Sequence, residues 1–182
     1  FTEQTEKAIE ITNNADLIFL LDFNDLSRIG EYTETVRNSS STKIMIDHHQ
    51  EPNMNDADLV FSDTSSCSTA QLLFEILDGL SFKSMINKDV AECIYAGIMT
   101  DTGSFKYSTT TSKTHKVISE LIDAGAENSK VHDLIYDNYS EDRTKLLGYC
   151  LNDKLQIFPE LNSAIISLTE EELDRFNFKK GD

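Results

Sequence analysis

The sequence predicts an α/β fold in which a parallel sheet is sandwiched by helices, followed by the start of a second α+β domain. Short apolar runs alternate with helical patterns up to about residue 150, which is typical of parallel sheets covered by helices on both faces. The runs are continuously apolar, as in strands that are buried on both sides. After Asn152, two strand patterns follow each other directly, so a different architecture begins there.

Three apolar segments are predicted to form the parallel strands. Each is too short to be a core helix, and the first is bounded by acidic residues on both sides. The strands are expected at Leu17–Leu21, Lys43–Ile46 and Leu59–Phe61. A helix is predicted over Thr5–Asn13, before the first strand, and another over Ser27–Asn38, between the first and the second.

The remaining elements are recognised from capping residues and from apolar residues at helical or strand spacing. Helices are expected from Ser68 (a capping box with Gln71) to Gly79, from Asn87 to Thr100, from a cap at Thr111 or Ser112 to Gly125, over Val131–Tyr136 and over Glu141–Cys150; strands are expected over Lys154–Phe158 and Ser163–Ser167, with a short helix after Thr169.

Composition limits the classes of function. The 182 residues carry 32 acidic and 16 basic side chains, a net charge of −16. A groove for long duplex nucleic acid needs a basic stripe, and none is present. No apolar run approaches the roughly 18–20 residues of a membrane helix, and no signal peptide is visible. The three cysteines form no C-x-x-C pair. We therefore expect a cytoplasmic protein without a membrane partner.

Acidic and imidazole residues follow the predicted strands, at the edge where parallel sheets bind ligands. Asp22 follows the first strand, Asp47, His48 and His49 follow the second, and Asp101 begins the loop after a helix. Mixed carboxylate and imidazole ligands suit manganese, iron or zinc. Adjacent histidines point in different directions from a strand end, so His48 can bind a metal while His49 faces a substrate phosphate.

Each of these residues also has a structural interpretation. A single aspartate such as Asp22 or Asp101 is more often a helix cap or a turn residue, and an isolated histidine pair is more often a surface feature. The complete triplet Asp47–His49 directly after an apolar strand is rarer by chance, which favours a metal site. Two metal ions about 3.5–4 Å apart suit the attack of hydroxide on phosphorus.

Several stretches of the sequence resemble motifs of the DHH phosphoesterase family. Leu21–Gly30 is similar to the second motif of the family, Ile46–His49 to the third, and Gly97–Phe105 to the fourth. Ser65–Ala70 and Thr114–His115 also match the branch of oligoribonucleases (nanoRNases) that dephosphorylate phosphoadenosine phosphate. Members of this branch are often labelled exopolyphosphatase-related proteins.

The resemblance implies a role for each matching residue. Asp22 would be the ligand that bridges two divalent metal ions, expected to be manganese. His48 and Asp101 would be further metal ligands. His49 would act catalytically by contacting the scissile phosphate, and Asp47 would orient the histidines.

Two further residues are predicted to bind the substrate. Lys106 lies where many members of the branch have arginine, and it can still bind phosphate as a point charge. His115 is either a phosphate contact or a structural residue in the first turn of its helix.

The sequence departs from the family at both ends. The first family motif, roughly His-x-x-Pro-Asp-x-Asp-Ala, does not occur in the chain. The resemblance therefore implies that residues 1–150 form a DHH domain without its first strand and first motif. Residues 151–182 would begin the DHH-associated substrate-binding domain. We expect an inactive internal segment of a protein of roughly 300–350 residues, a size that fits two domains.

The predicted activity is hydrolysis of short oligoribonucleotides and phosphoadenosine phosphate through two-metal activation of water. A cyclic-dinucleotide phosphodiesterase and an exopolyphosphatase or pyrophosphatase are alternatives with the same chemistry. A non-catalytic nucleotide-binding module is an alternative of another class. The partner would be a short oligoribonucleotide or nucleotide substrate, and a homodimer is left open.

Overall fold

The computed structural model describes residues 5–179 and contains two compact units, one that extends to Val131 and one that begins at His132. Within the described residues, no helix has both the length and the apolar character needed to cross a membrane. The division between the two units falls within helix α6 (Asn128–Tyr136). It does not test the predicted domain boundary after residue 150, which stays a prediction.

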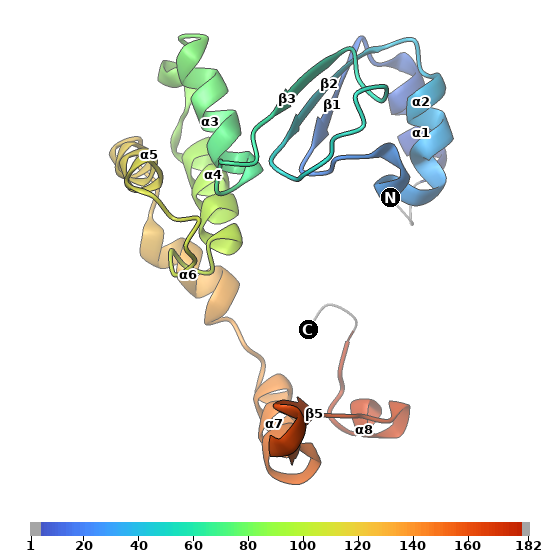
Figure 1. The fold of residues 1–182 in the computed structure, drawn as a ribbon, viewed down its shortest axis with the longest axis vertical. Coiled ribbons are helices and arrows are strands. Elements are labelled where there is room, and N and C mark those ends of the chain that lie inside the picture. The colour runs from blue at the N-terminus through green and yellow to red at the C-terminus, as the bar shows by residue number, and fades with distance from the viewer. Residues whose placement is uncertain (1–4, 180–182) are drawn as a thin grey trace. The chain divides into compact units, whose positions relative to one another are not determined.

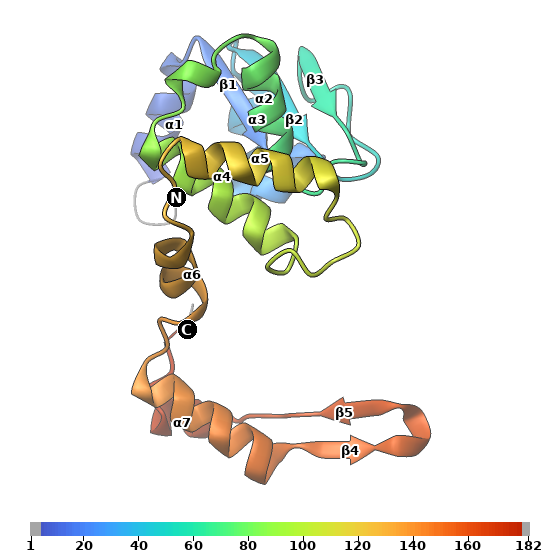
Figure 2. The same ribbon diagram turned by 90° about the vertical axis from the view of Figure 1, so that its left-hand side faces the viewer.

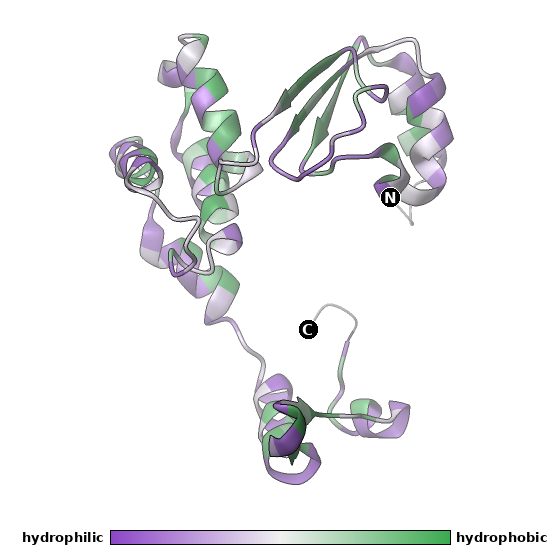
Figure 3. Cartoon of the chain, viewed as in Figure 1, coloured by the Kyte–Doolittle hydropathy of each residue, from purple (hydrophilic) through white to green (hydrophobic). Residues whose placement is uncertain are grey.

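A three-stranded parallel sheet forms part of the first unit (Figure 1). Its strands are β1 (Leu17–Leu21), β2 (Thr42–Asp47) and β3 (Leu59–Ser62), in the order β1-β2-β3. β1 and β3 are hydrophobic along most of their length, and β2 has a hydrophobic centre at Ile44–Ile46 (Figure 3). Leu21 pairs with Ile46, so the carboxyl ends of β1 and β2 lie at the same edge. The predicted α/β class is confirmed.

One face of this sheet carries the hydrophobic core. Helices α1 (Thr5–Asn14) and α2 (Thr33–Asn38) pack against each other, and the buried side chains of Leu20, Val36 and Met45 form one cluster. Side chains of alternate strand residues point to the opposite face. On that face α3 contacts β2, while Phe19 and Phe61 of the flanking strands remain exposed.

The segment predicted to be helical over Ser27–Asn38 is helical, but it is divided into two elements of different type. A 3₁₀ helix, η1 (Leu26–Tyr32), is followed by the short α2. Gly30 interrupts η1 itself, because its φ of 59° and ψ of −121° lie outside the helical region, and glycine adopts a positive φ readily. The hydroxyl of Thr33 donates to the carbonyl of Gly30 at 2.7 Å and stabilises the break.

Three longer helices complete most of the first unit: α3 (Thr69–Gly79), α4 (Lys88–Asp101) and α5 (Ser112–Asp123). They pack against one another, and a 3₁₀ turn, η2 (Lys83–Met85), joins α3 to α4. Ser68 caps α3 by accepting a hydrogen bond from the amide of Gln71, as expected. The side-chain amide of Gln71 instead donates to Glu75, so the predicted capping box is only half formed.

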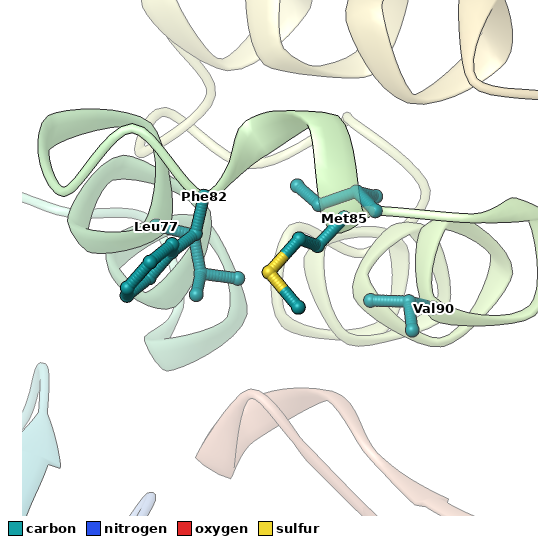
Figure 4. Close-up of a pocket in the computed structure, with 5 residues that line it drawn as sticks. Leu77, Phe82, Met85 and Val90 are labelled. Atoms are coloured by element: carbon teal, nitrogen blue, oxygen red, sulfur yellow. The ribbon is translucent and has the colours of Figure 1, made fainter.

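An apolar hollow of about 350 Å³ lies between the end of α3 and the start of α4 (Figure 4). Its walls are formed by Leu77, Phe82, Met85, Ile86 and Val90. None of these side chains can act as an acid, a base or a strong metal ligand. This hollow is therefore not a candidate for the chemistry that the sequence predicts.

The second unit combines helices with an antiparallel strand pair (Figure 2). Helix α7 (Glu141–Tyr149) continues into a π-helical turn, η3 (Cys150–Lys154). Strands β4 (Gln156–Phe158) and β5 (Ser163–Ile165) pair through the 3₁₀ turn η4 (Pro159–Leu161), and α8 (Glu170–Arg175) follows. The carboxylate of Glu172 accepts hydrogen bonds from Tyr149 and Lys154. These bonds fasten α8 to the end of α7.

Candidate metal centre

Three residues from two strand ends come together at the carboxyl edge of the sheet. Asp22 follows β1, and His48 and His49 follow β2. One potential ligand atom from each side chain lies within 4.8 Å of the other two. The backbone N–H of Asp22 donates to the carbonyl of Ile46 at 3.2 Å, which holds the end of β1 against β2. Parallel pairing therefore unites residues that are far apart in the sequence.

The ring of His48 is oriented by a backbone carbonyl. Its Nδ1 lies 3.3 Å from the carbonyl oxygen of Ser66. A carbonyl only accepts hydrogen bonds, so Nδ1 carries the proton in this contact. In the neutral ring the lone pair is then on Nε2. Nε2 is 3.8 Å from Oδ1 of Asp22 and also 3.8 Å from Oδ2 of Asp101. His48 thus presents a free ring nitrogen to two carboxylates.

The ring of His49 is held by a different group. Asp47 is completely buried. Its Oδ1 lies 2.7 Å from Nδ1 of His49, and its Oδ2 accepts the backbone N–H of the same residue at 3.1 Å. The side chain of His49 remains 49% exposed, so the ring is anchored on one side and accessible to solvent. Asp47 therefore forms its hydrogen bonds with His49, whereas the carbonyl of Ser66 contacts the ring of His48.

The hydrogen bond with Asp47 raises the pKa of His49 above its ordinary value of 6.5, and the charges of Asp47 and Asp22 act in the same direction. Burial and the charge of Arg28 lower this pKa by smaller amounts. A protonated His49 donates from both ring nitrogens. It can therefore bond to Asp47 and to an anion at the same time.

We expect Asp47→Asn to lower the pKa of His49 in the metal-free protein, because the strongest partner of the imidazolium is removed. NMR titration of the imidazole signals in the presence of a chelator measures this change, and His115 is the internal reference. Since the folded-state pKa is raised, protonated His49 stabilises the fold below an unfolded-state pKa of about 6.5. That contribution disappears as the pH rises through the folded-state pKa. An unchanged His49 titration in Asp47→Asn would contradict the assignment.

Asp101 is the last residue of α4 and lies beside the trio formed by Asp22, His48 and His49. Burial raises its pKa, and the nearby carboxylate of Asp22 raises it further, while His48 and His49 lower it. Two carboxylates that face one imidazole form a site whose negative charge a cation would offset. This donor set fits a divalent cation, and oxygen and nitrogen ligands of this kind suit manganese, iron or zinc.

The loop after Asp101 has an unusual backbone. Gly103, Ser104 and Phe105 have φ values of 56°, 59° and 67°, and non-glycine residues rarely adopt this left-handed region. The fully buried Thr102 holds the loop, because its carbonyl accepts the backbone N–H groups of Lys106 and Tyr107. Such conformations are found at binding sites more often than elsewhere.

The two predicted substrate-binding residues lie outside the trio. Lys106 is exposed on the loop after Asp101, and His115 is exposed in the first turn of α5. The ring of His115 lies 6.0 Å from that of Phe105, between centroids. Within residues 5–179, no hydrogen bond or ion pair joins either side chain to the trio. Their roles in substrate binding stay predictions.

The turn before α3 and the first residue of this helix contribute contacts that the sequence patterns do not predict. Besides the carbonyl of Ser66, the hydroxyl of Thr69 donates to Oδ1 of Asp22 at 2.9 Å. In the sequence, this segment is indicated by its small side chains and by the match of Ser65–Ala70 to the oligoribonuclease branch, but neither indicates its partners. Its partners His48 and Asp22 lie 18 and 47 residues away from Ser66 and Thr69, so only the fold reveals them.

Comparison with known proteins identifies similar chains. A family model described as the DHH family, N-terminal domain, matches residues 1–98. The bifunctional oligoribonuclease and PAP phosphatase NrnA of Bacillus subtilis is 32% identical over 168 residues, which cover 91% of this chain and 51% of the relative. The cyclic-di-AMP phosphodiesterase GdpP of the same organism is 32% identical over 177 residues, covering 94% of this chain and 25% of the relative.

A solved structure has the same fold. The crystal structure of an exopolyphosphatase-related protein from Bacteroides fragilis superposes with a TM-score of 0.94 at 39% sequence identity. The match covers 99% of this chain and 52% of that protein. The chain thus spans about half the length of the oligoribonuclease NrnA and of the B. fragilis protein.

Proposed function

The chain belongs to the DHH family, and on that premise we propose that it is part of a metal-dependent phosphoesterase. The observation that carries this proposal is the convergence of Asp22, His48 and His49 within 4.8 Å at the carboxyl edge of the sheet. We propose that residues 1–150 form a DHH domain without its first strand and motif. Residues 151–182 begin the substrate-binding domain, and the chain alone is inactive.

Each residue of the centre has a proposed role. Asp22, His48 and Asp101 hold two divalent cations, with manganese as the proposed metal. Bound cations of this kind lower the pKa of water and neutralise charge on phosphoryl oxygens. His49 contacts the scissile phosphate, because its exposed ring is anchored through Nδ1 and its raised pKa favours the proton-donating form. Donation to a phosphoryl oxygen stabilises charge that develops in the transition state.

The proposed substrates are short oligoribonucleotides and phosphoadenosine phosphate. The net charge of −16 argues against a surface that binds long nucleic acid, whereas a metal centre can attract a small phosphate ester. The likeness to NrnA of B. subtilis supports these substrates. The likeness to the cyclic-di-AMP phosphodiesterase GdpP supports a cyclic dinucleotide as the second candidate.

A substrate panel tests this proposal. The full-length protein is incubated in Mn²⁺ with a dinucleotide RNA, phosphoadenosine phosphate, cyclic di-AMP and pyrophosphate, and the same reactions with a chelator are the control. We expect hydrolysis of the first two substrates, with loss of activity in the chelator. Preferential hydrolysis of cyclic di-AMP would favour the second candidate. Binding of nucleotides without hydrolysis of any substrate would refute the enzyme assignment.

A further inference from the structure

We propose that Thr69 is a positioning residue that holds the carboxylate of Asp22 in the orientation that binds a divalent cation, an inference that rests on the proposed metal centre. The hydroxyl of Thr69 donates to Oδ1 of Asp22 at 2.9 Å. Within the described residues, this is the hydrogen bond that reaches the Asp22 carboxylate. An oxygen of a carboxylate has two lone pairs, so Oδ1 can accept this bond and still bind a cation.

Asp22 needs such a support because little else restrains its side chain. The residue lies at the open end of β1 with a φ of 66°, and its side chain is 54% exposed. An exposed carboxylate samples several rotamers, and ordering it on metal binding costs conformational entropy. A hydrogen bond from a fixed hydroxyl orders the carboxylate before the metal binds and so reduces this entropy cost. Groups that form hydrogen bonds with metal ligands generally act in this way.

The hydroxyl of Thr69 is itself fixed. Thr69 is the first residue of α3 and is only 6% exposed. Its neighbour Ala70 lies against Gly97 of α4, where a Cβ added to the glycine would lie 2.7 Å from the Ala70 Cβ. Close contact between α3 and α4 therefore sets the position from which Thr69 reaches Asp22.

The same turn also holds the second ligand. The carbonyl of Ser66 orients His48, and Thr69, three residues later, orients Asp22. Two proposed ligands from different strand ends thus form hydrogen bonds with the same short segment, Ser66–Thr69. This segment sets their relative orientation. A threonine that served only to start α3 would not need a bond to a residue 47 positions away.

Calorimetric titration of Mn²⁺ into the full-length protein tests this role without relying on activity. We expect Thr69→Val to weaken Mn²⁺ binding by about 10- to 100-fold, the usual effect of losing a partner of a metal ligand. Thr69→Ser keeps the hydroxyl and is expected to retain the affinity of the wild type. Thr12→Val is the matched control, because Thr12 is also partly buried but its hydroxyl donates to the carbonyl of Ala8 within α1.

The outcomes separate this inference from the proposed function. Equal Mn²⁺ affinity in the wild type and Thr69→Val would overturn the role of Thr69 and leave the metal centre standing. An equal loss in Thr69→Val and Thr12→Val, with matching falls in melting temperature, would reduce the effect to general destabilisation and also overturn it. A wild-type protein that binds no Mn²⁺ would refute the metal centre and with it the role of Thr69.

Discussion

Replacing Asp22 with asparagine is expected to weaken Mn²⁺ binding and to lower phosphoesterase activity by more than about 100-fold, because losing a ligand should exceed the ten- to hundredfold cost of losing its support. Asparagine has nearly the same size and can still accept the hydrogen bond from Thr69. It lacks the negative charge that attracts a cation to the site between His48 and Asp101. The substitution therefore isolates the charge of the ligand from its shape.

The matched control is Asp16→Asn. Asp16 is an exposed residue directly before β1, whereas Asp22 directly follows this strand. At about 3.3 Å per strand residue, the two carboxylates lie roughly 20 Å apart. Both variants remove one negative charge, so calorimetry with Mn²⁺ and hydrolysis of a dinucleotide RNA by the full-length variants compare a site effect with a general charge effect. Similar results for both variants would refute Asp22 as a ligand.

The second large effect is expected for Gly97→Ala, which should destabilise the protein by about 1–3 kcal/mol. A Cβ added at Gly97 would lie 2.7 Å from the Cβ of Ala70, and α3 and α4 pack against each other. The helices must separate to admit the methyl group. Because α3 carries Thr69 and α4 carries Asp101, their separation should also weaken Mn²⁺ binding.

Gly148→Ala provides the matched control for this substitution. Gly148 lies within helix α7, and an added Cβ would meet no atom within 4 Å. Helix propensity alone favours alanine over glycine by about 1 kcal/mol, so Gly148→Ala should be neutral or stabilising. Chemical denaturation of both variants measures the two effects. A Gly97→Ala protein as stable as the wild type would show that the α3–α4 contact can relax without cost.

Local sequence patterns predict most of the elements. The apolar run Leu17–Leu21 predicts a strand, which the structure confirms, although Leu20 is buried in it and Phe19 is exposed. The cap at Ser68 marks the start of α3. The exception is the segment around Gly30. Glycine within a helical pattern costs only about 1 kcal/mol, so the sequence does not distinguish a helix that tolerates glycine from one that glycine interrupts. The bond from Thr33 to the carbonyl of Gly30 favours the break.

Some features of the candidate site are likewise predicted from the sequence, and others are visible only in the structure. The sequence alone indicates Asp22 and His48 as candidate metal ligands, because each follows an apolar strand and the ends of parallel strands meet at one edge of the sheet. The tautomer of His48, the separate support of His49 by Asp47, and the bond from Thr69 to Asp22 are properties of the tertiary structure.

The sequence by itself therefore determined the α/β class, the strands and the residue types of a candidate metal site, since these follow from local periodicity and from the chemistry of single side chains. Only the tertiary structure decided which groups orient the ligands. Those contacts depend on how the turn at Ser66–Thr69 is placed against the strand ends. That placement results from packing between segments far apart in the chain, and no local pattern encodes it.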